Sequence, residues 1–282
     1  MDKKTVLRQP LPSDRTYEQL LNHYSVEKKL ADRLKGSDRE SRKEIYSTMY
    51  DELFQKVPDH PRLTCRSSTE DTEIWNKVKY SLVKRHIEKS TIFLEFAPGD
   101  CQFAYKIAVS VSEVFAVDIS DQRSHKELAP DNFKLIVYDG YDLPEIDPGS
   151  VDVVFSFQLI EHLHPEDTRN HFELVQKILK PGGKYVFQTP HAMSGPYDIS
   201  KYFSDVAEGF HLKEWTYREI KPIVLKSGFS SLLPRLSTAG IDINIPFEYY
   251  SGLEKIIEKF PRKFRRLISK RLIPMLYAVA IK

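Results

Sequence analysis

The sequence predicts an α/β protein, built on a largely parallel β-sheet with helices on both faces. From Ile92 onward, short apolar runs rich in β-branched and aromatic residues alternate with segments whose apolar residues recur at helical spacing. Strands separated by helices pair in parallel, because each helix returns the chain to the same end of the sheet. Before Ile92 the pattern is helical. The order of the elements therefore predicts the fold class and where the sheet begins.

Residues 1–90 are predicted to form a helical extension. Apolar side chains recur at helical spacing in Tyr17–Tyr24, in Ile45–Phe54 and in Ile74–Ile87. We expect this extension to lie as a lid over a second part of the chain, residues 91–282, which contains the sheet.

Five strands are predicted in this second part, and the clearest helical pattern among them is Asp167–Leu179. The strands are Ile92–Phe96, Val114–Val117, Lys134–Tyr138, Val151–Phe157 and Tyr185–Gln188. Parallel sheets bind ligands beyond the carboxyl ends of their strands, near the point where the strand order reverses. Residues that directly follow each strand are therefore the candidates for a site.

The loop after the first strand is typical of a turn that holds a ligand. It reads Glu95-Phe96-Ala97-Pro98-Gly99-Asp100-Cys101, and its small residues would let the backbone turn sharply and approach a ligand closely. The helix that follows would present its N-terminal amide groups to that ligand. A tight turn without a ligand would have a similar sequence, so this loop alone does not define a site.

Polar residues also follow the next three strands. Asp118 ends the second strand, where nucleotide-binding sheets place a carboxylate on ribose hydroxyls, although an aspartate there could instead cap a helix. A carboxylate suits a vicinal diol because it accepts two hydrogen bonds. Asp139-Gly140 and Gln158 follow the third and fourth strands and would flank an adenine ring, with Asp139 bonded to the exocyclic amine. Four consecutive strands thus end in residues suited to a nucleoside.

As a set, these segments resemble the successive motifs of class I methyltransferases that use S-adenosylmethionine (SAM). The resemblance extends from about Ile92 to Phe229 and includes the Glu95–Cys101 loop, Val117–Ser120, Asp139-Gly140, Val151–Leu163, Leu179–Lys184 and His211–Phe229. It implies a Rossmann-like sheet of seven strands, flanked by helices, whose last strand, Leu276–Ile281, is antiparallel. It also implies SAM as cofactor and the following cofactor-binding residues: Glu95, Ala97, Gly99, Asp118, Ile119, Asp139, Gly140 and Gln158.

The first loop departs from the glycine-rich pattern of the family. Ala97 stands in place of the first glycine and Cys101 in place of the third. Because alanine tolerates most turns except those with positive φ, we expect an adjusted loop with the site retained. A nicotinamide cofactor is disfavoured, because its fingerprint has glycines where Ala97 and Gln102 stand.

Three histidines are candidates for the base that an alcohol acceptor needs. SAM carries the reactive methyl group, so the protein has to position the acceptor, exclude water and accept a proton, which histidine does near neutral pH. His191 is preferred because it directly follows the fifth strand; His162 and His211 are the alternatives. Each could instead be structural, by bonding backbone, packing near the cofactor or fixing a loop. No metal site is predicted, although Glu161, Asp198 or Asp205 could meet in the fold.

The connection 191–213 is longer than usual and is predicted to line the acceptor site. Tyr197, Asp198 and Tyr202 offer an aromatic wall and a polar group for a ring-shaped acceptor such as a sugar. Tyr50 of the extension could face the same pocket or form interface core. The segment loosely resembles one in methyltransferases associated with bacterial surface polysaccharides or specialised metabolites.

The leading interpretation is O-methylation of a small molecule or a sugar or glycan building block. N- or C-methylation of a metabolite or a quinone-like lipid is the first alternative, because the fold does not determine the acceptor. A methyltransferase-like module that binds partners without turnover is the second. A nucleic-acid partner is not expected from a net charge of +2, and Phe157-Gln158-Leu159 lacks the pattern of enzymes that methylate nucleobase amines.

Partners and location follow from composition. The run 255–271 is basic and partly apolar; it is either a solvated helix face or a weak contact for anionic lipid or an acidic carrier. Two cysteines are too few for a disulfide framework and the N-terminus lacks a signal-peptide pattern, so a cytoplasmic location is expected. The oligomeric state is left open.

Overall fold

Helices occupy the chain before residue 92, and strands alternate with helices after it. The structure, a computed structural model, describes residues 7–65, 69–123, 126–238 and 241–282. The first helices are α1 (Tyr17–Lys35), α2 (Arg39–Lys56), α3 (Pro61–Cys65) and α4 (Thr69–Val83). The strands are β1 (Ile92–Phe96), β2 (Glu113–Asp118), β3 (Phe133–Val137), β4 (Val151–Phe157), β5 (Leu179–Pro190), β6 (Ser231–Thr238), β7 (Ile241–Asn244) and β8 (Met275–Ile281). The remaining α-helices are α5 (Gln102–Ala108), α6 (Thr168–Ile178), α7 (Tyr217–Lys226), α8 (Phe247–Glu258) and α9 (Arg262–Leu272), with short 3₁₀ helices at Lys126–Leu128, Ile160–His162 and Ile199–Tyr202.

The strands form one sheet in the order β3-β2-β1-β4-β5-β8-β6-β7. Strands β1 to β5 pair in parallel, and β8 lies antiparallel between β5 and β6. The predicted Rossmann-like α/β fold and its antiparallel last strand are confirmed. The predicted number of strands, seven, is too low by one: the additional strand β7 is a four-residue antiparallel partner of β6 at the sheet edge, too short for its alternation to register in the sequence.

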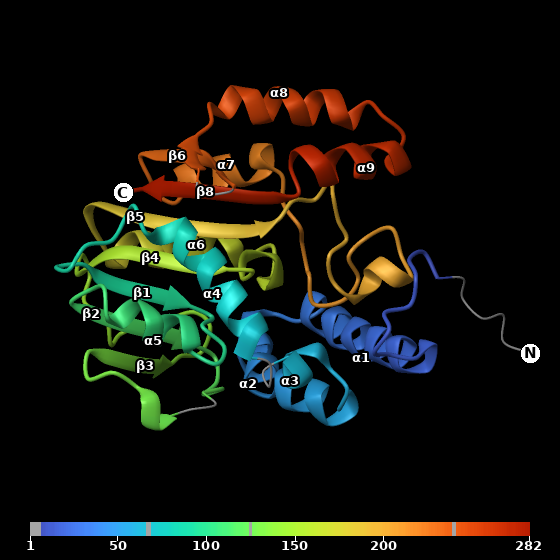
Figure 1. Cartoon of the computed structure of the whole chain (residues 1–282), viewed down its shortest axis with the longest axis horizontal. Helices are drawn as coiled ribbons and strands as arrows, with labels where there is room; N and C mark the ends of the chain where they lie inside the picture. The colour runs from blue at the N-terminus through green and yellow to red at the C-terminus, as the bar shows by residue number, and fades with distance from the viewer. Residues whose placement is uncertain (1–6, 66–68, 124–125, 239–240) are drawn as a thin grey trace, which may run out of the picture.

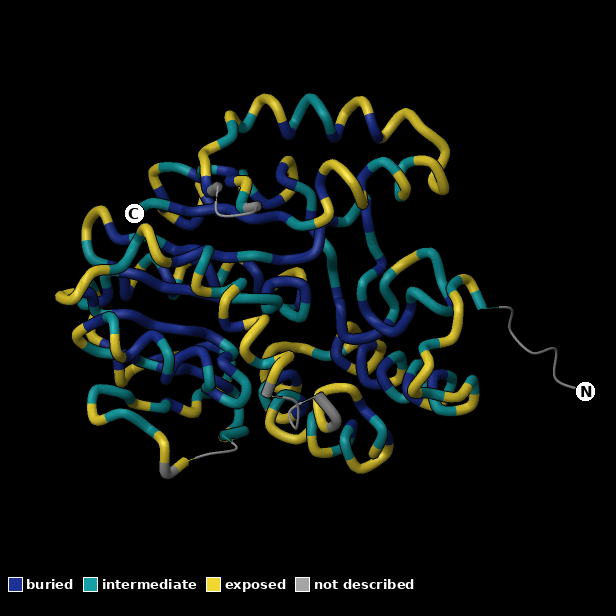
Figure 2. Tube along the Cα trace, in the orientation of Figure 1, coloured by how far each residue is buried: buried dark blue, intermediate teal, exposed yellow. Residues whose placement is uncertain are grey.

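The two faces of the sheet carry separate apolar cores. On one face, Leu82 of α4 and Phe103 of α5 pack against Phe155 of β4 and its neighbours. On the other face, Phe172 of α6 and Tyr217 of α7 belong to a larger cluster that reaches α8. Figure 2 shows the central strands as buried and the outer turns of the covering helices as exposed. The sheet is therefore covered on both sides, and its carboxyl end is left for ligands.

Helices α1 to α3 gather at that carboxyl end (Figure 1). The arrows of β1, β4 and β5 point toward them, and the 3₁₀ helix Ile199–Tyr202 packs on α1. Residues before Ile92 thus stand next to the predicted site. The division of the chain into a helical extension and a sheet-containing domain stays a prediction, and residues 1–6 and 66–68 of the extension lie outside the described residues.

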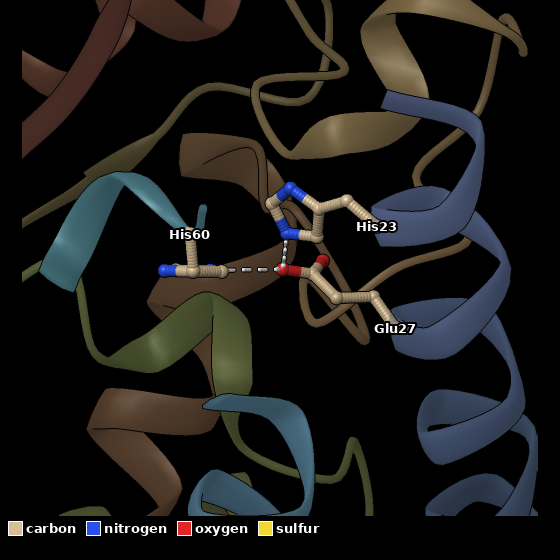
Figure 3. A group of neighbouring side chains, drawn as sticks. All are labelled: His23, Glu27 and His60. Atoms are coloured by element: carbon tan, nitrogen blue, oxygen red, sulfur yellow. Dashed lines mark hydrogen bonds and ion pairs between the residues drawn. The ribbon is translucent and has the colours of Figure 1, made fainter. Parts of the chain in front are cut away.

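A buried glutamate links α1 to the connection after β5. Glu27 Oε1 accepts a hydrogen bond from His23 Nε2 at 2.7 Å and lies 3.6 Å from His60 Nε2 (Figure 3). Its Oε2 accepts from the backbone N–H of Phe210 at 3.2 Å. Burial alone would raise the pKa of this carboxyl, but the hydrogen bonds from the two histidines outweigh burial and hold the pKa of Glu27 well below its usual range. Glu27 is therefore a charged junction between three segments.

The basic run 255–271 comprises the end of α8, the turn after it and most of α9. Phe264 and Leu267 of α9 are exposed, 60% and 56%, on a helix without an acidic residue. Contact of this surface with anionic lipid or an acidic carrier stays a prediction. Among the described helices, none is long and apolar enough to cross a bilayer.

Candidate active site

A cavity lies at the carboxyl ends of β1, β2 and β4, where the strand order reverses. This is the place where open parallel sheets bind ligands. The lining residues lie at the ends of β1 to β4 or in the loops that follow them, or come from α2, α3 and the start of α6. They are Tyr46, Met49, Tyr50, Arg62, Ala97, Gly99, Val117, Asp118, Ile119, Gln122, Tyr138, Gly140, Tyr141, Gln158, Leu159, His162, Leu163, Asp167, Asn170 and His171. We call it the cofactor cavity.

The structure brings six of the eight predicted cofactor residues to the cofactor cavity. These are Ala97, Gly99, Asp118, Ile119, Gly140 and Gln158. Asp118 is 7% exposed, and its carboxylate accepts hydrogen bonds from the N–H groups of Gly99 and Ile119 at 3.2 and 2.7 Å. Burial raises the pKa of Asp118. Asp118 thus fixes the β1 loop through the N–H of Gly99. Each of its carboxylate oxygens still has a lone pair that can accept from a ligand hydroxyl.

The β1 loop keeps a left-handed backbone without its glycines. Ala97 and Cys101 have φ values of 53° and 63°, close to the 62° of Gly99, and Gln158 after β4 has a φ of 56°. We expected alanine to avoid such a conformation; that expectation is wrong. A non-glycine residue in this region costs roughly 1–2 kcal/mol, and such strain concentrates at ligand-binding sites. Among the described residues, two of the three strained ones, Ala97 and Gln158, line the cofactor cavity, and Cys101 belongs to the same loop as Ala97.

Replacing Ala97 with glycine is expected to stabilise the fold. Glycine adopts positive φ without strain, so we expect the free energy of unfolding to rise by about 1 kcal/mol, after the greater entropy of an unfolded glycine is subtracted. Urea denaturation measures the change. Ala104→Gly, inside α5, is the control and is expected to destabilise by a similar amount. Destabilisation by both substitutions would contradict the assignment of strain to Ala97.

Glu95 and Asp139 lie outside the lining of the cofactor cavity. Glu95 is 1% exposed; its Oε1 pairs with Lys79 Nζ at 3.1 Å, and its Oε2 has no hydrogen-bond partner among the described residues. Asp139 Oδ1 accepts from the N–H groups of Tyr141 and Asp142, and its Oδ2 lies 3.1 Å from Lys43 Nζ. Asp139 therefore organises its own loop, which is a correction to its predicted position beside an adenine ring.

A neutral histidine forms part of the cavity wall. His171 of α6 is 6% exposed, and its Nε2 lies 2.8 Å from the hydroxyl of Tyr185, which in turn contacts Ser156 at 2.7 Å. Burial lowers the pKa of His171 to about 3. The unfolded chain takes up this proton near pH 6.5, whereas the folded chain stays neutral. Acid therefore favours the unfolded state.

Folding stability is accordingly expected to fall by up to a few kcal/mol as pH drops from 6.5 toward 3. Urea unfolding at a series of pH values, for the wild type and for His171→Gln, measures this contribution. Carboxylates also titrate between pH 6.5 and 3. The contribution of His171 is therefore the difference between the stability curves of the wild type and His171→Gln. Parallel curves would show that His171 does not contribute to acid sensitivity.

The structure does not bring His191 to the cofactor cavity. Its side chain is fully buried, its Nε2 donates to Glu254 Oε1 of α8 at 2.9 Å, and its Nδ1 accepts from the N–H of Met193 at 3.3 Å. Both ring nitrogens are engaged, so neither has a free lone pair for an acceptor proton. The predicted placement of His191 at the mouth of the site is therefore wrong, because the ring joins β5 to α8.

His162 and His211 meet beside a second cavity. Their rings lie 5.0 Å apart, edge to face. The second cavity, which we call the side cavity, is lined by Glu27, Tyr50, Leu53, His60, Arg62, His162, Asp198, Phe210 and His211. It shares Tyr50, Arg62 and His162 with the cofactor cavity. His162 thus stands where the two cavities meet.

The two rings have opposite protonation preferences. His162 Nδ1 donates to the carbonyl oxygen of Phe210 at 2.9 Å, and burial lowers the pKa of His162 to about 3, so its Nε2 keeps a lone pair. His211 Nδ1 lies 2.8 Å from Glu214 Oε1. Burial disfavours the imidazolium, but the hydrogen bond to Glu214 and the charge of Glu161 outweigh it and raise the pKa of His211 to about 9.

The four predicted acceptor residues divide between two places. Tyr50 and Asp198 line the side cavity. Asp198 is partly occupied, because its carboxylate accepts from the N–H groups of Ser200 and Gly209. Tyr197 and Tyr202 lie instead in a neighbouring pocket that contains Arg15 and Lys201 and shares Asp198 and His60 with the side cavity. The two predicted tyrosines of the connection therefore do not line the same cavity as Tyr50.

Several site residues were not singled out from the sequence. Arg62, Asp167 and His171 line the cofactor cavity but do not directly follow a strand of the sheet, so nothing in the local pattern marks them. Tyr141 also lines it and lies in the loop after β3, just beyond Asp139-Gly140. From the sequence, Glu161 is expected only as an acid that could meet others in a metal site. Its position next to His162, shortly after β4, is the feature that marks it as a site residue.

Comparison with known proteins identifies a methyltransferase domain in this chain. The family model described as "Methyltransferase domain" matches residues 94–187, from β1 into β5. No curated protein sequence matches the chain. Among solved structures, a chain of the complex between the Haloferax volcanii Trm112 methyltransferase activator and a methyltransferase is 19% identical, with a TM-score of 0.52 over 76% of this chain and 94% of that chain.

Two further solved structures share the fold. Haemonchus contortus phosphoethanolamine N-methyltransferase 2, in complex with SAM, is 20% identical with a TM-score of 0.50; the match covers 74% of this chain and 52% of that chain. The YcgJ protein from Bacillus subtilis is 14% identical with a TM-score of 0.50 over 76% of this chain and 99% of that chain. At these identities the likeness concerns the fold alone.

Residues 94–187 are matched as a methyltransferase domain. The sheet order and the cavity at its switch point fit the class I fold of such domains, which use SAM. The lining of the cavity fits that cofactor at Asp118, whose oxygens would accept hydrogen bonds from ribose hydroxyls. The unpartnered Oε2 of Glu95 would be an acceptor for the ammonium group of SAM, but Glu95 lies outside that lining. When bound, SAM supplies an electrophilic methyl group.

Proposed function

We propose that the protein transfers the methyl group of SAM to a hydroxyl oxygen of a small polar acceptor, such as a sugar or glycan building block. The observation that carries this proposal is the pair of adjacent cavities, which share His162 in their lining. One cavity has the position of a nucleoside site at the switch point of the sheet. The other lies beside it and is lined by aromatic, charged and polar side chains.

The side cavity is suited to a hydroxylated acceptor. Its wall combines the aromatic ring of Tyr50 with polar side chains that include Arg62 and Asp198. A sugar presents both apolar ring faces and hydroxyl groups, so it would match such a wall. Residues 198–211 contribute three of the lining residues, which supports an acceptor-lining role for the connection 191–213.

Methylation of a hydroxyl needs removal of its proton. The acceptor oxygen forms a bond to the methyl carbon as the carbon–sulfur bond breaks, and the electron pair of that bond stays on sulfur. Activation of the hydroxyl falls to Glu161, His162 and His211, which lie together where the cavities meet. His191, the base first predicted, is too far inside the protein core for this task.

Transfer of labelled methyl groups from SAM into fractionated cell extract tests this proposal. We expect label in a low-molecular-weight or glycan fraction, as a methyl ether that survives mild alkali. Label on an amine or a carbon would favour the N- or C-methylating alternative. Absence of SAM binding by calorimetry would overturn the enzymatic interpretation and favour a non-catalytic module.

A further inference from the structure

We propose that Glu161, His162 and His211 form a binding site for one divalent transition-metal ion, such as Mn²⁺, Fe²⁺, Co²⁺ or Zn²⁺. Each residue can offer one ligand atom, and these atoms all lie within 4.8 Å of one another. Two atoms that each bind one ion at about 2.0–2.2 Å can be up to about 4.4 Å apart. Small side-chain rotations therefore suffice to close the site. Two imidazoles and a carboxylate are a ligand set for such ions.

The carboxylate of this cluster lacks a partner. Glu161 is fully buried; its Oε2 accepts from the hydroxyl of Thr189 at 2.8 Å, whereas Oε1 has no hydrogen-bond partner among the described residues. A buried carboxylate oxygen without a donor is costly. Neither histidine ring is close enough to bond it directly, although both belong to the same cluster. A cation between the three groups would satisfy Oε1.

The outer atoms of the cluster are already fixed in the manner of metal ligands. Metal-binding histidines commonly donate their other N–H group to a carbonyl or a carboxylate, which fixes the ring and its tautomer. His162 Nδ1 donates to the carbonyl of Phe210, and His211 Nδ1 donates to Glu214. The Nε2 atom of each ring is left without a protein partner in the part of the chain that the structure describes. All three proposed ligands thus have supported outer atoms and inner atoms without a partner among the described residues, and a bound ion would displace the Nε2 proton of the His211 imidazolium.

A second group of two histidines and a glutamate provides the contrast. In the cluster of His23, Glu27 and His60 (Figure 3), Arg15 Nη1 donates to His23 Nδ1 at 2.9 Å and the N–H of Arg62 donates to His60 Nδ1 at 3.1 Å. Both rings therefore carry their proton on Nε2, which points at Glu27. An ion bound to the two Nε2 atoms would move each ring proton to Nδ1. The hydrogen bonds that Arg15 and the N–H of Arg62 donate to these Nδ1 atoms would then be lost. This cluster is a hydrogen-bond network, and we expect no metal in it.

The position of the proposed ion deepens the proposed function, on which its catalytic role rests. Because His162 lines both cavities, the ion would lie where the acceptor approaches the methyl group. Three protein ligands leave coordination positions open. An acceptor with two neighbouring oxygens, such as a vicinal diol, could occupy two of them. The ion would lower the pKa of the bound hydroxyl, whose proton leaves to water as the oxygen attacks the methyl carbon. This replaces the prediction of a metal-free site.

Metal binding by the full chain, freed of metal with chelator, tests the proposal without any acceptor. We expect equilibrium dialysis with Mn²⁺ and then Zn²⁺ to give one bound ion per chain. Glu161→Gln and His211→Gln should each weaken binding by at least about 100-fold, as loss of a ligand exceeds the 10–100-fold effect of an outer-shell change. His60→Gln is the matched control and should leave metal binding unchanged. SAM affinity should persist in both ligand variants, which shows that they fold.

Three results would overturn the site: no stoichiometric binding of either ion by the wild type, unchanged binding in both ligand variants, or loss of binding in His60→Gln alone. Metal bound as expected, together with label that appears only on amines or carbons, would support the site and overturn the proposed hydroxyl acceptor. Methyl transfer to a hydroxyl that is unaffected by chelator would support the proposed function and overturn the catalytic role of the ion.

Discussion

Asp118→Ala is expected to weaken SAM binding more than any other single change in the cofactor cavity. The substitution removes the carboxylate that would hold the ribose and also frees the N–H of Gly99 in the β1 loop. Each hydrogen bond to a charged group contributes about 1.5–3 kcal/mol. One lost bond corresponds to a roughly 10- to 150-fold higher dissociation constant, and two lost bonds to the square of that factor. Isothermal titration calorimetry with SAM measures the change.

Glu113→Gln is the matched control for this experiment. Glu113 is the first residue of β2 and Asp118 is the last, so Glu113 lies at the amino end of that strand, away from the cofactor cavity. Its replacement should leave SAM affinity unchanged. Equal affinities for wild type and Asp118→Ala would show that the ribose is held elsewhere, and the orientation of the cofactor in the cavity would have to be reassigned.

Arg42→Met is expected to cause the largest loss of stability. Arg42 of α2 has a side chain only 3% exposed, and its guanidinium contacts the Asp167 carboxylate at 2.7 and 2.9 Å. The hydroxyl of Tyr141 donates to the same carboxylate at 2.7 Å. Removal of one partner of a buried ion pair leaves an unpaired buried charge and costs about 3–5 kcal/mol. Urea denaturation should show this loss as a lower free energy of unfolding.

The double substitution Arg42→Met with Asp167→Asn separates two explanations. If the cost comes from the stranded carboxylate, the double variant should recover much of the stability, because no buried charge remains. If the double variant is as unstable as Arg42→Met or worse, the loss comes instead from the packing of the arginine stem. The variants also report on the cofactor cavity, because Asp167 and Tyr141 line it.

The parallel part of the fold could be predicted because each strand has its own local signal. The run Val151–Phe157, for example, is apolar and rich in β-branched residues, and it forms β4 within the predicted bounds. The edge of the sheet has no such signal. Strand β6 contains Pro234 and several polar residues, and β7 is only four residues long, so their pairing depends on tertiary contacts.

The cofactor cavity could be predicted to the extent that it follows the strands. Asp118 and Gly99 are placed by the strands that precede them. Asp139 also follows a strand, but a lysine from α2 and two backbone N–H groups turn its carboxylate toward its own loop. The sequence cannot reveal which helix packs over a strand end. For the same reason His191 was misplaced, since its partner Glu254 lies 63 residues further along the chain.

The wall of the cofactor cavity has a consequence for how the acceptor specificity of such a protein can evolve. Residues 94–187 match the methyltransferase model, whereas Tyr46, Tyr50 and Arg62 belong to helices that precede the first strand. All three line the cofactor cavity, and Tyr50 and Arg62 also line the side cavity. Substitutions in that leading stretch can alter which molecule is accepted while the groups that hold SAM stay as they are. Proteins that share the central segment and differ in their first 65 residues should therefore differ in acceptor more than in cofactor affinity, and exchange of that stretch between them is a direct route to new acceptors.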